Sequence, residues 1–104
     1  MTELLPLAYG YLRMDLVDDG DRAEQQITQA AQHLGFQMAA VFREHSPETI
    51  VPTAYLDLVC ECCRADAHTV IAAPGHLSGM AVPQVVLLDM LATRARAHVR
   101  EVTL

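Results

Sequence analysis

The sequence has no lysine, only three cysteines and no long apolar run. The missing lysine excludes phosphotransfer sites that depend on one. The cysteines are odd in number and lie close together, which excludes a disulfide framework and makes a reducing cytoplasm the expected compartment. The stretch Met1–Gly10 has neither a basic leader nor a membrane-length apolar segment, so we expect no signal peptide and no membrane anchor.

Basic residues are also scarce. The net charge is −6, and it falls mainly in residues 1–52, which carry three arginines and eight acids. Protein surfaces that bind a duplex depend on cationic groups that displace counterions, so a nucleic acid partner is not expected. With 52% hydrophobic residues, the chain predicts one folded domain over residues 1–104.

Short apolar runs alternate with segments of helical periodicity. The runs predict strands at Leu4–Met14, Phe36–Phe42, Thr69–Ala73 and His98–Leu104. The helical spacing predicts helices at Arg22–Leu34, Thr53–Ala65 and Gln84–Ala95, with Asp21 and Thr53 as N-terminal caps. This order predicts a three-layer, flavodoxin-like α/β fold with a parallel sheet of about four strands and helices on both faces.

In such a fold, functional groups lie at the carboxyl ends of the strands. Here those ends lead into the segments Met14–Asp21, Arg43–Pro52 and Pro74–Val82. Side chains that could carry chemistry are therefore expected in these three loops.

Five segments, taken in order, carry a family resemblance. They are residues 9–13 (YGYLR) with the following helix that holds Gln25 and Gln26, Val41–Glu44, Val51–Pro52, Arg64–Ile71 and Gly75–Gly79. Together they resemble the catalytic domain of serine recombinases, the resolvases and invertases. In that family the first strand reads roughly G-Y-x-R-V-S, and its serine attacks DNA. The resemblance covers nearly the whole chain and implies the same α/β fold.

The chain departs from the family at the positions that matter for catalysis. Asp15 stands where the family has its nucleophilic serine; Val51, His76 and Gly79 stand where it has phosphate-binding arginines; Gly75 replaces an aspartate, and only Arg13 is retained. Phosphoryl transfer needs a nucleophile and several cations around the phosphorus. The resemblance therefore implies that recombinase chemistry is lost, with no catalytic residue and no cofactor.

The family continues after its fourth strand with a further strand, a long dimerisation helix and a helix-turn-helix DNA-binding domain. We expect none of these beyond Leu104. The leading hypothesis is a catalytically inactive domain that serves as a protein-interaction or regulatory module and self-associates. Residual DNA association inherited from the recombinases is an alternative.

The acidic turn after the first strand suggests a second alternative. Asp15, Asp18, Asp19 and Asp21 lie where receiver domains and haloacid-dehalogenase phosphatases keep Mg²⁺ ligands, and clustered carboxylates suit a hard cation. A metal-dependent phosphoryl-transfer enzyme that uses Asp15 is therefore an alternative. Both families also need a lysine, so we favour a solvated turn with a helix cap and no metal.

The cysteines could suggest zinc or redox chemistry. On a helix Cys60 and Cys63 share a face that Cys62 does not, so three thiolates do not converge. We expect Cys60 and Cys63 to pack in the core and Cys62 to be exposed.

Histidine and serine side chains can act as catalytic bases and nucleophiles. His76 and Ser78 could form a nucleophile and base, but such a pair needs contact and an orienting group, so ordinary loop residues are expected. The remaining histidines read as surface or turn positions: His33, His45, His68 and His98.

The third helix is apolar almost all round, which indicates either deep burial or a covering partner. A four-stranded sheet leaves too little surface to bury it, so we expect a partner. The second helix adds an apolar stripe. The predicted interface residues are Tyr55, Leu58, Cys62, Val86, Leu87 and Met90. The expected partner is a second copy or another protein, without a membrane.

Overall fold

The computed structural model describes residues 5–45 and 52–103. Its elements are β1 (Leu7–Arg13), the short 3-10 turn η1 (Met14–Leu16), α1 (Gly20–His33), β2 (Gln37–Glu44), α2 (Thr53–Ala65), β3 (Thr69–Ala72), α3 (Gln84–Ala95) and β4 (His98–Glu101). The predicted bounds of α2 and α3 are confirmed, and the other ends differ by a few residues. Val51 and most of the predicted second loop lie outside the described residues.

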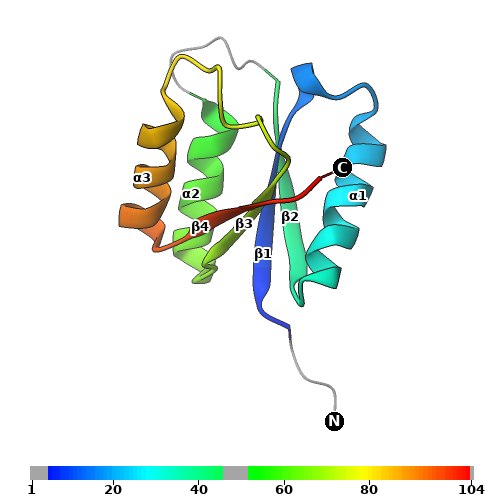
Figure 1. Ribbon diagram of the computed structural model, residues 1–104. Coiled ribbons are helices and arrows are strands. Elements are labelled where there is room, and N and C mark those ends of the chain that lie inside the picture. Colours follow the sequence, from blue (N-terminus) through cyan, green and yellow to red (C-terminus); the bar gives the residue numbers. More distant parts are fainter. Residues whose placement is uncertain (1–4, 46–51, 104) are drawn as a thin grey trace.

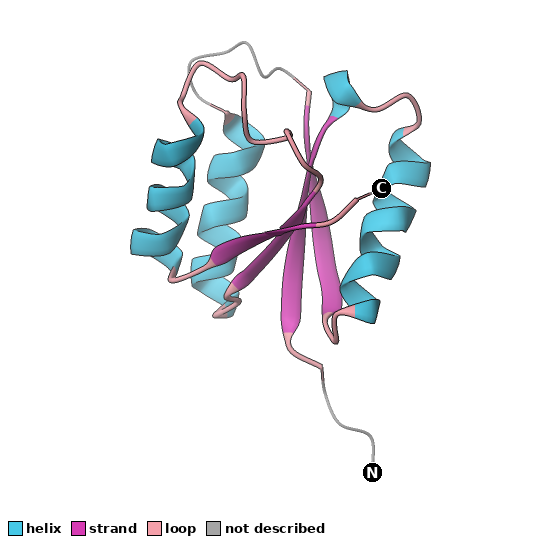
Figure 2. Ribbon diagram, in the orientation of Figure 1, coloured by secondary structure: helices cyan, strands magenta, loops and turns pink. Residues whose placement is uncertain are grey.

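The four strands form one parallel sheet in the order β2-β1-β3-β4. Helix α1 covers one face of the sheet, and α2 and α3 lie side by side on the other (Figure 1, Figure 2). The predicted three-layer α/β architecture is confirmed. No helix in the described ranges has the length and apolarity that a membrane crossing requires.

Strand β1 lies at the centre, with apolar side chains on both faces, as its sequence predicted. Ala8 and Leu12 pack with Ile27 of α1, whereas Tyr9 and Tyr11 face α2 and α3. Gly10 suits the close packing here, since a β-carbon at this position would lie 3.0 Å from the Val41 side chain of β2. Strand β1 is thus packed on both faces and paired with a strand on each side.

Two helix caps differ from the sequence prediction. Asp19, and not Asp21, caps α1 by accepting a hydrogen bond from the Arg22 amide at 3.2 Å. The helix begins two residues earlier than predicted, because Gly20 is already helical, and Asp21 pairs with Arg43 instead. Thr53 is the first residue of α2 and makes no capping bond. A carboxylate from β2 takes over that role, as described below.

The predicted burial of the cysteines is wrong. Cys62 is fully buried, whereas Cys60 and Cys63 are exposed. The face of α2 that carries Tyr55, Leu58 and Cys62 packs against the sheet instead. Its Tyr55 ring meets the Tyr11 ring edge-on, with centroids 5.4 Å apart.

Candidate functional site

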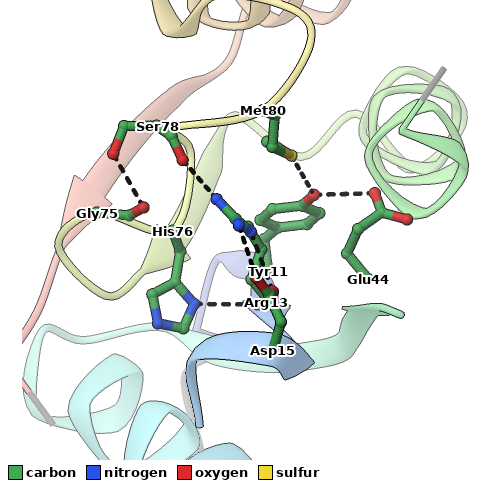
Figure 3. A network of polar contacts seen from close by, with 8 residues as sticks. All are labelled: Tyr11, Arg13, Asp15, Glu44, Gly75, His76, Ser78 and Met80. Carbon is green, nitrogen blue, oxygen red and sulfur yellow. Dashed lines mark hydrogen bonds and ion pairs between the residues drawn. The ribbon is translucent and has the colours of Figure 1, made fainter. Parts of the chain in front are cut away.

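The polar side chains that the sequence singled out meet at the carboxyl end of β1. Arg13 ends the strand, Asp15 follows in η1, and His76 and Ser78 reach it from the loop between β3 and α3 (Figure 3). This is the end of the sheet at which parallel α/β folds place functional groups.

Arg13 and Asp15 form a two-pronged ion pair. Arg13 Nε donates to Asp15 Oδ1 at 3.2 Å, and Nη2 donates to Oδ2 at 2.7 Å. The remaining Nη1 donates to the carbonyl of Ser78. All three guanidinium nitrogens are thus engaged, and the Arg13 side chain is only 8% exposed. The guanidinium beside Asp15 lowers the pKa of that carboxyl group below its usual range.

His76 is a buried neutral base, although the sequence suggested an ordinary loop residue. Its Nδ1 accepts a hydrogen bond from the Arg13 backbone amide at 3.0 Å, so the nitrogen that faces β1 carries no proton. Burial, followed by the nearby Arg13 charge, lowers the pKa of His76. His76 is therefore an uncharged side chain that braces the end of β1.

The loop around His76 has a backbone suited to glycine. Gly75 and Gly79 have φ values of +85° and +77°, in the left-handed region that side chains disfavour. Ser78 lies between them, and its hydroxyl donates to the Gly75 carbonyl at 3.0 Å and not to His76. The loop thus does not assemble a Ser–His nucleophile pair.

A second polar cluster lies beside the first and was missed from the sequence. Glu44, at the end of β2, is 2% exposed. Its carboxylate accepts hydrogen bonds from the Tyr11 hydroxyl at 2.9 Å and from the backbone amides of Ala54 and Tyr55 at 3.2 and 3.3 Å. Burial, with the Glu44 hydrogen bond, strongly raises the pKa of Tyr11. Glu44 therefore caps α2 from a different element, which local sequence patterns do not reveal.

The acidic turn does not gather its carboxylates at one point. Asp15 pairs with Arg13, Asp19 caps α1, and Asp21 pairs with Arg43 at 2.9 Å on an exposed surface. Across residues 5–45 and 52–103, no three or more candidate ligands converge as a metal site would require.

The predicted interface residues divide into buried and exposed groups. Four of them pack against the sheet with no exposed area, so their assignment to an interface is wrong: Tyr55, Leu58, Cys62 and Leu87. Val86 is 45% exposed and Met90 is half-buried. Val85 at 72% exposed and Leu88 at 36% extend this apolar surface of α3.

Comparisons with known proteins bear on the fold. Neither a protein-family model nor a curated protein sequence matches the chain. Among solved structures, the chain is similar to the C-terminal catalytic domain of ISC1926 TnpA, an IS607-like serine recombinase. The TM-score is 0.75 with 16% identity, and the match covers 94% of this chain and 69% of that one. The chain therefore has the fold of a serine recombinase catalytic domain, as its sequence resemblance implied.

Proposed function

We propose that this chain is a catalytically inactive domain of serine recombinase fold that acts as a protein-interaction or regulatory module. The observation that carries the proposal is the ion pair between Arg13 and Asp15. A guanidinium binds phosphate through the same two-pronged geometry in which Arg13 already holds the Asp15 carboxylate. The Asp15 carboxylate thus fills the anion-binding side of Arg13, the one retained cation. Its negative charge also repels an incoming phosphate.

Among residues 5–45 and 52–103, the neighbours from the loop between β3 and α3 supply no replacement for the occupied cation. His76 is held neutral by its bond to the Arg13 amide and by its lowered pKa. Gly79 offers no side chain, and its positive φ makes an arginine there costly. Removing the cations from around a transferring phosphoryl group costs several kcal/mol of barrier, about 3 kcal/mol for each strong contact. These features support a loss of phosphoryl transfer rather than a change of substrate.

The exposed apolar surface of α3 supports an interaction role. Val85, Val86 and Leu88 lie within about one turn at the start of α3, and each is more than a third exposed. Contiguous exposed apolar side chains favour contact with another protein surface. We propose that this α3 surface binds a partner protein, and that the domain also associates with itself.

The catalytic half of the proposal is tested by incubating the purified protein with plasmid DNA and with phosphomonoesters, each with Mg²⁺ or Mn²⁺. We expect neither nicked or covalently attached DNA nor released phosphate. The variant Asp15→Ser, which returns a hydroxyl to this position, is expected to remain inactive because the cations are still missing. Turnover by the natural protein that Asp15→Asn abolishes would instead establish the metal-dependent enzyme.

The binding half is tested by capture of tagged protein from its source cells after nuclease treatment. We expect a near-stoichiometric protein that Val85→Asp loses. Leu16→Asp is the matched control, since Leu16 is 51% exposed outside the α3 surface. Recovery that depends on nucleic acid would favour residual DNA association and contradict the proposal.

A further inference from the structure

An open groove lies between β2 and α2, away from the Arg13 cluster. Its volume is about 590 Å³. Tyr9, Ala39, Ala40 and Phe42 form the sheet side, and the helix side is a set of residues that we call the α2 stripe: Asp57, Cys60, Glu61 and Arg64. The residues that line this groove include none of the Arg13 cluster.

The groove arises from an irregularity in β2. Ala8 pairs with Met38 and Tyr9 pairs with Ala40, so Ala39 is an extra residue without a partner on β1. Two neighbouring alanines therefore line the groove, where larger side chains would fill it. Such a bulge also discourages backbone pairing at a sheet edge. Association at this side would consequently rely on α2 side chains.

The α2 stripe carries an acid at one end and an arginine at the other. Its spacing of i, i+3, i+4 and i+7 places the four side chains on one helix face. Asp57 is exposed at the end nearer the helix N-terminus, and Arg64, with a 72% exposed side chain, lies two turns later. Cys60, also exposed, lies near the midpoint. The stripe carries −1 (two acids, one arginine), against −6 for the chain.

We propose that the groove and the α2 stripe bind a second copy of this chain through antiparallel packing of the two α2 helices about a two-fold axis. An axis at the midpoint of residues 57 and 64 places Asp57 of each copy opposite Arg64 of the other. The two Cys60 side chains then lie beside the axis. An interface of this kind is self-complementary, as a symmetric dimer requires.

Several features favour a second copy over an unrelated partner. Opposite charges stand at the two ends of the stripe, so one two-fold arrangement forms two Asp57–Arg64 pairs. Glu61 also lies beside the axis, where Arg64 of its own copy offsets its charge. Arg64 already donates to Glu61 through Nε at 2.9 Å and Nη2 at 2.5 Å, which holds its side chain on the groove wall. A guanidinium has five donor hydrogens, so Arg64 retains donors for the Asp57 of a second copy. Rim charges of this type fix the register of an interface.

This inference rests on the self-association within the proposed function and assigns a surface to it. The first test is a charge swap measured by sedimentation over a concentration series. Asp57→Arg and Arg64→Asp each create two like-charge contacts, so each is expected to raise the dimer dissociation constant about tenfold or more. The double variant restores opposite charges and is expected to return within about threefold of the natural protein. Asp89→Arg, an exposed charge reversal on α3, is the matched control and should have no effect.

The second test uses the exposed cysteines under mild oxidation. Cys63→Ser, which keeps Cys60, is expected to form a disulfide-linked dimer, and Cys60→Ser, which keeps Cys63, is not. A dimer that ignores the charge reversals, or that cross-links equally well without Cys60, overturns this interface and leaves the proposed function intact. A protein that is monomeric at every concentration overturns both this inference and the proposed self-association, whereas the catalytic assays test the loss of phosphoryl transfer separately.

Discussion

The carboxyl end of β1 and the outer side of α2 use similar polar side chains in opposite ways. At the end of β1, Arg13, Asp15 and His76 bind one another or the backbone. Across residues 5–45 and 52–103 no buried side-chain nitrogen or oxygen lacks a hydrogen-bond partner. On α2, Asp57 and Arg64 are exposed and keep spare hydrogen-bonding capacity. The polar groups at the end of β1 bind one another within the fold, whereas Asp57 and Arg64 remain exposed and are the groups that we propose for binding.

We expect the largest loss of stability from replacing Glu44, the buried carboxylate beside the Arg13 cluster. Glu44→Ala removes the acceptor of the Tyr11 hydroxyl and of two α2 amides, all within 3.3 Å. Buried donors without an acceptor are costly, so we expect the free energy of unfolding to fall by about 3 kcal/mol or more. Urea denaturation measures it. Glu101→Ala, at an exposed acid, is the control and should change stability by less than about 0.5 kcal/mol. Equal effects would show that the cluster is not structural.

Removing the partner of Arg13 should have a smaller effect. Asp15→Ala leaves a guanidinium whose side chain is 8% exposed without its carboxylate, and we expect a loss of about 1–2 kcal/mol because Asp15 itself is partly exposed. The contribution of Asp15 has a predictable pH dependence. Its pKa is lowered in the folded state, so its stabilisation is present above the ordinary value of 3.8 and is lost as the pH falls below that value. A variant as stable as the natural protein would show that the ion pair is not formed.

The contribution of His76 to stability is expected to depend on pH. Its folded pKa is lowered from 6.5, so the unfolded chain binds the proton more readily. Stability is therefore complete above pH 6.5 and falls as the pH drops below it, with a slope of at most about 1.4 kcal/mol per pH unit from this one group. Urea denaturation between pH 5 and 8 measures the slope. His76→Asn keeps an acceptor for the Arg13 amide but cannot titrate, so its curve should be flatter. A natural curve that rises toward acid would contradict the assignment.

The cysteines give the smallest effect, because they report access rather than stability. Cys60 and Cys63 are exposed on α2, whereas burial raises the pKa of Cys62 to about 11. We expect a thiol reagent to modify two cysteines rapidly in the folded protein and the third only after unfolding. Mass spectrometry of the modified peptides identifies them. Rapid modification of Cys62 would mean that the packing of α2 on the sheet has been misjudged.

The sequence predicted the architecture because the relevant patterns are local. The runs that became β1 and β3 are apolar on both faces, and α3 was bounded correctly because Pro83 and the Arg96–Ala97 segment flank one periodic stretch. Such signals depend on residues within one element.

Errors arose where a choice depended on contacts between elements. Two faces of α2 were similarly apolar, and only packing of Tyr55 against Tyr11 decides that Cys62 is buried. Glu44 caps a helix that begins beyond the next loop, so no cap motif precedes Thr53. His76 is placed by its bond to the Arg13 amide, which lies 63 residues away in the chain. A local pattern carries no information on such pairings.

The central claim is that Asp15 already occupies the anion-binding face of Arg13. The most direct measurement is titration of the protein with inorganic phosphate while the Nε–H resonance of Arg13 is followed by NMR, with Asp15→Asn as the comparison. We expect that the resonance of the natural protein does not move saturably, because Asp15 holds both Nε and Nη2 of the guanidinium. A saturable shift at Arg13 in the natural protein would contradict it, since the site would then be open to phosphate.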